Sequence, residues 1–251
     1  MPRCPYKGSL VWCHAFSRNM HAVAYYSRKE NGKRRRRAVY SDLTHVLGMR
    51  FRDNLKHDEQ NIIAISGQPG SGKSTLGIQL AKEIQPGWTL ESGYVYDEDD
   101  LNKKMAQNSK NQVFLFDEAS LAINSRDSMS KSSRNIIAIL DTCRSRHNSI
   151  IFCLPSFDDL NKSVRERLCQ IRIHCASRED HIVKGYSGRG IYQVYQPIRG
   201  EFSDTYWKLI ATGVFSKLSK EDSAAYVKIK NQNQERFLSK IQINTEEVEE
   251  E

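Results

Sequence analysis

The residues best suited to chemistry form a glycine-rich segment that ends in a lysine and two hydroxyl residues. It reads Gly67, Gln68, Pro69, Gly70, Ser71, Gly72, Lys73, Ser74 and Thr75. The pattern G-x-x-x-x-G-K-S is typical of a loop whose glycines let backbone N–H groups turn toward phosphate oxygens. We expect Lys73 to reach the β- and γ-phosphates of ATP, Ser74 to bind Mg²⁺, and Thr75 to support the loop or contact the α-phosphate. The segment therefore predicts a binding site for ATP with Mg²⁺.

The elements on either side of this loop fit that interpretation. An apolar, β-branched run from Asn61 to Ser66 precedes it and predicts a buried strand. Ser74 to Ile84 carries apolar residues at helical spacing, and Pro86 with Gly87 ends that pattern. A loop between a strand and a helix is the setting that the motif requires, because the start of the helix adds partial positive charge beside the phosphates.

Two adjacent acids supply a second chemical signal. Asp117 and Glu118 directly follow the apolar run from Gln112 to Phe116. In a P-loop ATPase the first acid holds the Mg²⁺ shell and the second polarises the attacking water, so we assign these roles to Asp117 and Glu118. Adjacent strand residues point in opposite directions, which leaves a structural role open for one of them. A glutamate placed as general base favours hydrolysis over phosphoryl transfer to a metabolite.

Further candidate catalytic residues lie on either side of the next predicted strand, Ser149–Leu154. Ser156, beyond Ser149–Leu154, is either a polar sensor of the γ-phosphate or a helix cap for the residues from Phe157 onward. Arg144 and Arg146 close the preceding predicted helix, and Arg165 and Arg167 lie farther along. An arginine from a neighbouring subunit can stabilise charge on the transferring phosphate. We take Arg144 and Arg146 as candidate catalytic fingers, while an ordinary surface role stays open for each.

The remaining pattern predicts alternating strands and helices. Besides the elements named above, it comprises strands at 93–96 and 168–176, helices at 97–107 and 133–146, a hairpin formed by 182–186 and 190–195, and a helical segment at 202–233. Alternation of this kind predicts an α/β fold with a mostly parallel central sheet covered on both faces. We divide the chain into a basic appendage at 1–40, an ATPase core at 41–200 and a C-terminal extension with an acidic tail at 201–251.

Composition narrows the class of partner and compartment. The 251 residues carry a formal net charge of +8, which favours a polyanionic partner. The basic run from Lys33 to Arg37 predicts either a non-specific, salt-sensitive nucleic-acid contact through a short arm or a solvated tether. No apolar run reaches the roughly 18–20 residues of a membrane span. Six scattered cysteines indicate reduced thiols packed in the core of a cytoplasmic protein, although Cys4, Cys13 and His14 leave a metal site open.

From Gly67 to Leu168 the chain resembles the HerA–FtsK group of ring-forming, DNA-pumping ATPases, above all genome-packaging ATPases and zonula-occludens-toxin-like proteins. The residues that carry the resemblance are Gly67–Ser74, Asp117-Glu118-Ala119, Arg144-Ser145-Arg146-His147-Asn148, Ile150-Ile151-Phe152, Pro155 and Val164-Arg165. The resemblance implies a RecA-like three-layer sandwich, a homo-oligomeric ring and ATP-driven movement of DNA in a host cytoplasm or a virion. Many members carry glutamine where this chain has Leu154-Pro155-Ser156, so the sensor stays unassigned.

Three other classes of protein compete with a DNA motor. An AAA+ or DnaA-like replication ATPase or helicase loader should carry a helical lid after the sheet, where this sequence predicts a hairpin. A small-molecule kinase usually carries a mobile lid with arginines and no glutamate placed as a base. An assembly protein would use ATP as a switch. Turnover with and without DNA separates these classes.

Overall fold

The computed structural model describes residues 22–30, 33–107, 110–117, 140, 146–177, 190–200 and 205–249. The chain divides into two compact units between Ser216 and Lys217. The first unit holds a large sheet with its covering helices, and the second holds the long helix α7 (Lys220–Glu249). Within these ranges, no helix combines the length and the apolar character needed to cross a membrane.

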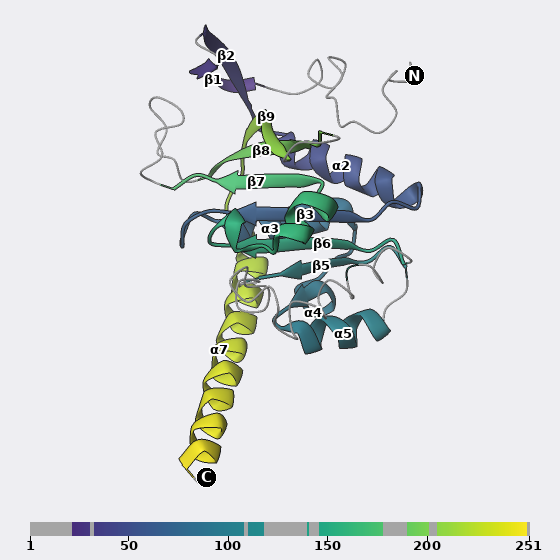
Figure 1. Cartoon of the computed structure of the whole chain (residues 1–251), viewed down its shortest axis with the longest axis vertical. Coiled ribbons are helices and arrows are strands. Elements are labelled where there is room, and N and C mark those ends of the chain that lie inside the picture. Colours follow the sequence, from purple (N-terminus) through teal and green to yellow (C-terminus); the bar gives the residue numbers. More distant parts are fainter. Residues whose placement is uncertain are drawn as a thin grey trace. The chain divides into compact units, whose positions relative to one another are not determined.

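The described strands form one nine-stranded sheet in the order β1-β2-β9-β8-β7-β3-β6-β5-β4 (Figure 1). In chain order they are β1 (Ala22–Glu30), β2 (Lys33–Tyr40), β3 (Asn61–Ser66), β4 (Tyr94–Val95), β5 (Val113–Phe116), β6 (Ser149–Leu154), β7 (Ile171–Cys175), β8 (Ile191–Ile198) and β9 (Tyr206–Val214). The five strands from β7 to β4 run parallel to one another. The predicted α/β class with a mostly parallel central sheet is therefore confirmed.

The two strands at the centre of the sheet, β3 and β6, could be predicted from the sequence because they are buried on both faces. Every residue of β3 and of β6 is buried. A parallel strand covered on both faces is a continuous apolar run rather than an alternating one, and these two strands read NIIAIS and SIIFCL. Their predicted ranges match the structure, and β6 pairs with β3 from Asn61–Ser149 to Ser66–Leu154. The strand after the acid pair thus lies beside the strand that leads into the glycine-rich loop.

Helices cover both faces of this sheet and complete the predicted three layers. They are α2 (Leu43–Lys56), α3 (Lys73–Ile84), α4 (Leu90–Gly93), α5 (Glu98–Gln107), a 3₁₀ turn η3 (Phe157–Asp159) and a π turn η4 (Val164–Leu168). On the α3 face, Leu115 and Cys153 approach Gly77 closely. On the opposite face, Phe114 and Phe152 pack with Leu101 of α5. Alternate strand residues point to opposite faces, so β5 and β6 serve both layers.

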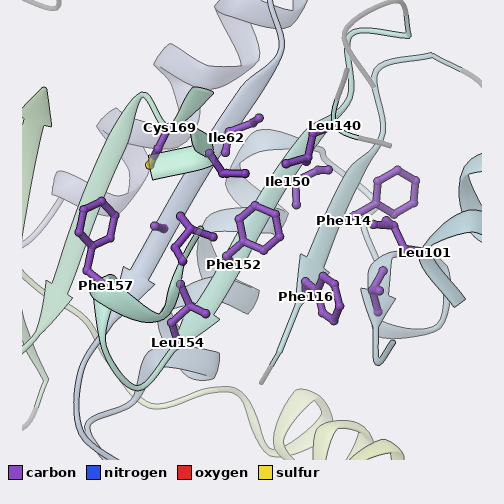
Figure 2. Packing of buried hydrophobic residues seen from close by; sticks show 14 of the residues in the cluster. Ile62, Leu101, Phe114, Phe116, Leu140, Ile150, Phe152, Leu154, Phe157 and Cys169 are labelled. Atoms are coloured by element: carbon purple, nitrogen blue, oxygen red, sulfur yellow. The ribbon is translucent and has the colours of Figure 1, made fainter. Parts of the chain in front are cut away.

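The core opposite α3 is rich in aromatic side chains (Figure 2). Phe114, Phe116 and Phe152 are fully buried, and the ring centroids of Phe116 and Phe152 lie 6.1 Å apart. Of the helix predicted at 133–146, Leu140 is helical and buried there, Arg146 lies in a turn, and the other residues lie outside the described ones. Burial of each such side chain contributes about 1.5–3 kcal/mol. This packing fixes the ends of β5 and β6, from which the site is built.

The helix predicted over 202–233 is wrong in its first part, because Tyr206–Val214 forms strand β9. The strand is rich in aromatic and β-branched residues, which favour a pleated surface, and it pairs antiparallel with β8. Helical structure begins at Lys220. Of the predicted hairpin, 191–195 lies in β8, whose described partners are β7 and β9, and 182–186 lies outside the described residues.

The basic run from Lys33 to Arg37 lies in a strand. It begins β2, which pairs antiparallel with β1 from Ala22–Tyr40 to Glu30–Lys33. We call this pair of strands, residues 22–30 and 33–40, the basic ribbon. Only Val39 and Tyr40 of the ribbon pair with β9, so the charged part has no third strand beside it among the described residues. The sequence did not predict these two strands, because the run of charged residues hides the strand tendency of the flanking tyrosines and valines.

Candidate nucleotide-binding site

The glycine-rich loop joins the carboxyl end of β3 to the amino end of α3, as the sequence predicts. Gln68, Pro69 and Gly70 are exposed, whereas Ser71 is buried. Gly72 precedes the helix with φ 95° and ψ 20°, a left-handed conformation that suits glycine. The loop is held at its start by the Gly67 N–H, which donates to the Pro155 carbonyl at 3.3 Å. Backbone donors of the loop and of the first turn of α3 are therefore gathered at one edge of the sheet.

Lys73 stands at this edge with its ammonium group folded over the loop. Its Nζ donates to the carbonyl oxygens of Gly67 at 2.8 Å and Gln68 at 3.1 Å. A phosphate oxygen carries negative charge and a carbonyl oxygen does not, so a phosphate would be the stronger partner for this cation. The side chain is thus already placed where an anion bound in the loop would meet a positive charge.

Ser74 and Asp117 are brought together across 43 residues of sequence. The Ser74 Oγ donates to Asp117 Oδ1 at 2.8 Å, and the Tyr94 hydroxyl donates to Asp117 Oδ2 at 3.4 Å. Asp117 is only 3% exposed, and a buried carboxylate is costly unless it is paired. The two hydroxyls provide that pairing. Carboxylate and hydroxyl oxygens are ligands that suit a hard cation such as Mg²⁺, so the donor set fits the predicted metal.

Ser71 gives a further indication that the loop is built for a ligand. Its side chain is 3% exposed, and its Oγ has no hydrogen-bond partner among the described residues. A buried hydroxyl without a partner costs about 1–3 kcal/mol, and a phosphate oxygen would accept a hydrogen bond from it. Thr75, two residues into α3, is partly buried beside the same loop. The loop therefore fits a phosphate group by its backbone, its lysine and its buried hydroxyl.

Two thiols lie behind the loop, and both are held neutral. Burial, followed by the negative charge of Asp117, raises the pKa of Cys153 well above its usual range. Burial raises the pKa of Cys175 to about 12, while the positive charge of Lys73 opposes that rise. A thiol reacts as a thiolate, so neither side chain supplies a nucleophile near neutral pH. Cys153, Cys169 and Cys175 are buried and free, as predicted for these three.

Of the other predicted catalytic residues, the structure describes only Arg146, which lies away from the loop. Glu118 and Arg144 lie outside the described residues. Arg146 precedes β6, whose first residue pairs with the first residue of β3, whereas the loop follows the last residue of β3. The two ends of such a six-residue strand lie roughly 20 Å apart. The Arg146 guanidinium donates instead to the Met105 carbonyl at the end of α5.

Ser156 has the capping role that the sequence left open. Its Oγ accepts from the Asp158 N–H at 3.3 Å, and the Asp159 carboxylate accepts from the Ser156 N–H at 2.9 Å. This reciprocal pair begins η3. Sequence reasoning missed two aromatic side chains near the loop, Tyr94 and Phe215. Tyr94 could have been found as a polar aromatic residue at the start of β4, the strand beside β5. The residues that flank Phe215 form no motif that would indicate a binding site.

Comparison with solved structures returned distant similarities. The genome packaging NTPase B204 from Sulfolobus turreted icosahedral virus 2, in complex with AMPPCP, is 13% identical with a TM-score of 0.38, over 55% of this chain and 92% of that one. The N-terminal domain of zonular occludens toxin from Neisseria meningitidis is 15% identical with a TM-score of 0.37, over 64% and 96%. The FIGL-1 AAA domain is 16% identical with a TM-score of 0.39, over 54% and 51%. Likenesses at this level carry no inference about substrate or partner.

No curated protein matches the chain. A family model does match it, the one described as Novel STAND NTPase 3, over residues 51–183. The matched range contains β3, the glycine-rich loop, α3 and Asp117. It confirms the predicted P-loop NTPase and the predicted hydrolysis of a nucleoside triphosphate. Because these residues make up more than half of the 251, the chain belongs to the Novel STAND NTPase 3 family.

Proposed function

We propose that the protein hydrolyses ATP with Mg²⁺ at the loop from Gly67 to Thr75 and uses the energy to move DNA. The observation that carries the first half is the hydrogen bond between Ser74 and Asp117, 2.8 Å long, beside the ammonium group of Lys73. It supports the proposal because the two oxygen atoms suit a cation and Lys73, the residue before Ser74, suits a phosphate. The second half is supported by the charge of the basic ribbon and is argued below.

The loop would bind the triphosphate through several donors. The backbone N–H groups of Lys73, Ser74 and Thr75 precede the first hydrogen bond of α3, from the Leu76 N–H to the Gly72 carbonyl, and would supply dipoles for phosphate oxygens. Lys73 would exchange its two carbonyl partners for the β- and γ-phosphates, and the Ser71 hydroxyl would gain the partner that it lacks. Lys73 would gain a negatively charged partner in place of neutral carbonyl oxygens and Ser71 would gain a hydrogen bond, so both residues would favour binding of the anion.

Ser74 and Asp117 are the proposed ligands of the metal ion. Bound Mg²⁺ would neutralise part of the charge on the β- and γ-phosphates. Tyr94 holds the second oxygen of Asp117 and so orients the carboxylate toward Ser74. We therefore assign Tyr94 as a positioning residue, in addition to the two proposed ligands.

Glu118 is the proposed general base, because it follows the metal-binding acid directly in the sequence. It would accept a proton from the attacking water as the bond to the γ-phosphate breaks. The test is Glu118→Gln, which keeps the size of the side chain and removes its basicity. We expect ATP affinity to stay within about twofold and turnover to fall by about 10²–10⁴-fold. Turnover near the wild-type rate would place the base elsewhere.

A DNA contact is supported by the distribution of charge. The basic ribbon carries seven basic residues and one acidic residue, a net +6, in a chain whose net charge is +8. Arg28 lies opposite Arg35 and Lys29 opposite Arg34 in the pairing of β1 with β2. Like charges directly opposite each other destabilise a pair of strands, and a polyanion would offset that repulsion. The major groove of DNA is wide enough to admit a two-stranded ribbon.

The test of DNA movement is ATP turnover by the full chain with and without duplex DNA. We expect DNA to raise the rate severalfold and the ribbon substitutions Arg34→Gln and Arg35→Gln to remove that stimulation without changing the basal rate. ATP turnover that does not respond to DNA would refute the proposed DNA motor and would indicate an ATPase with another role. Nucleotide binding without any turnover would favour an ATP-dependent switch in assembly.

The proposed arginine fingers would act between subunits of a ring. Arg146 lies at the sheet edge opposite its own loop, so it could reach a phosphate only on a neighbouring chain. The same proposal covers Arg144. Mixing Glu118→Gln chains with Arg146→Ala chains tests this: a finger given in trans restores some turnover in mixed rings, whereas two inactive chains that do not share sites stay inactive.

A further inference from the structure

We propose that the ring of Phe215 is the platform on which the base of the nucleotide stacks. This inference rests on the proposed function, since it takes the loop from Gly67 to Thr75 as the phosphate site. It adds a contact for the nucleobase, which neither the loop motif nor the acid pair provides.

Phe215 lies directly against the glycine that begins α3. A Cβ built on Gly72 would come within 2.6 Å of the Phe215 Cζ and 2.8 Å of its Cε2. The aromatic ring therefore borders the phosphate loop one residue from Lys73 and two residues from Ser74. Phe215 is only partly buried.

The ring is held in place from behind. Tyr192 is fully buried, its ring centroid lies 6.0 Å from that of Phe215, and its hydroxyl forms a 2.8 Å hydrogen bond with Thr44 Oγ1. The backbone of the same segment is also fixed. The Phe215 N–H donates to the Gly190 carbonyl at 2.9 Å, and the Ser216 carbonyl accepts from Gln79 Nε2 of α3 at 2.9 Å. A preorganised ring loses little freedom when a ligand stacks on it.

The order of the strands gives the direction of the nucleotide. Asp117 follows β5, which lies two strands from β3 on one side, while Phe215 follows β9, which lies three strands from β3 on the other side. The carboxyl ends of β3, β5 and β9 share one edge, because β9 is antiparallel to β8 and β8 is antiparallel to β7. If the γ-phosphate lies on the Asp117 side, the chain of phosphates leaves the loop toward Phe215.

The ligand class follows from the chemistry of the ring. A flat hydrocarbon face stacks on any nucleobase and makes no hydrogen bond that distinguishes one base from another. Phe215 thus supplies affinity for nucleoside triphosphates over inorganic phosphate chains, and it supplies no preference for adenine over guanine. Inorganic tripolyphosphate has the phosphates without the base and is the probe that separates the two contributions.

The experiment measures the affinity of the full-length chain for ATP, GTP and inorganic tripolyphosphate by calorimetry with Mg²⁺ present. In Phe215→Ala we expect ATP and GTP to bind about tenfold more weakly, because aromatic stacking on a base contributes on that scale. Affinity for tripolyphosphate should stay within about twofold. Phe215→Trp should retain nucleotide affinity. Tyr206→Ala is the matched control, because Tyr206 is an exposed aromatic residue at the other end of β9 and should affect none of the three ligands.

An equal loss of ATP and tripolyphosphate would overturn the proposal, since it would mean that the ring only supports the loop. Unchanged ATP affinity would overturn it as well. If Phe215→Ala does not fold, Phe215→Leu keeps the apolar contact, removes the flat ring and should show the same selective loss. A wild-type chain that binds neither ATP nor tripolyphosphate would instead refute the phosphate site itself.

Discussion

The contact between Gly72 and Phe215 gives a quantitative prediction for Gly72→Ala. Two separate penalties apply to the added methyl group. The backbone at Gly72 has φ 95°, and an L-residue in left-handed conformation costs about 1–2 kcal/mol. The Cβ would also lie 2.6 Å from the Phe215 ring, and overpacking of that kind costs about 1–3 kcal/mol. We expect Gly72→Ala to lower the free energy of unfolding by about 2–5 kcal/mol.

The same loop supplies a control that isolates the clash. Gly70 also has a positive φ, 77°, but a Cβ there meets no atom within 4 Å. Gly70→Ala should therefore cost only the backbone penalty, about 1–2 kcal/mol. In the Phe215→Ala background the cost of Gly72→Ala should fall to the same value, because the ring that it strikes is gone.

Urea unfolding of the four variants and the wild type, followed by circular dichroism, measures these differences. The coupling between Gly72→Ala and Phe215→Ala should be about 1–3 kcal/mol. The placement of the ring against the loop would be refuted if Gly70→Ala and Gly72→Ala lowered the free energy of unfolding equally. It would also be refuted if the effect of Gly72→Ala were the same with and without the Phe215 ring.

Three further predictions concern the loop, the thiols and the ribbon. Lys73→Ala should reduce ATP affinity by at least about 100-fold in calorimetry while leaving thermal stability unchanged, because its partners are carbonyl oxygens of a surface loop; normal affinity would refute the site. The pKa of Cys175 is raised from 9.0 to about 12, so its thiol ionises at lower pH in the unfolded chain than in the folded one. The contribution of this neutral thiol to the free energy of unfolding is therefore complete below about pH 9 and is lost from there to about pH 12. Cys175→Ala should make the decline in unfolding free energy shallower by about 1.4 kcal/mol per pH unit in that range, and an unchanged slope would contradict the neutral buried thiol. Arg34→Gln should reduce the slope of log affinity for DNA against log salt by about 1, measured by fluorescence anisotropy, whereas a loss that salt does not alter would argue against phosphate contact.

The parts of the fold that could be predicted are those that local pattern determines. The strands at Asn61–Ser66 and Ser149–Leu154 are apolar throughout because both of their faces are buried, and the glycine pattern between strand and helix follows from the needs of a phosphate loop. Strand β9 was missed because the segment 202–233 was treated as one polar helix, although Tyr206–Val214 holds a single charged residue among aromatic and β-branched ones. The local composition favours a strand, whereas its pairing with β8 is a nonlocal fact that the sequence of β9 alone does not contain.

The arginine assignment shows a deduction that sequence and topology together could have made. Arg146 precedes a strand parallel to β3, and the starts of parallel strands lie at the edge opposite their carboxyl ends. A residue just before β6 therefore lies far from a loop just after β3, whatever its charge. The grouping of the arginines near the predicted active edge suggested a finger for a neighbouring subunit, and the direction of the strand excludes contact with the loop of the same subunit.

The site as the structure has it draws on strands from both sides of β3. On one side, Tyr94 and Asp117 come from β4 and β5, and they hold Ser74. On the other side, Phe215 follows β9 and touches Gly72. β9 is also the strand that pairs with the basic ribbon through Val39 and Tyr40. The same strand, β9, therefore ends beside the phosphate loop and pairs with the ribbon of the proposed DNA contact.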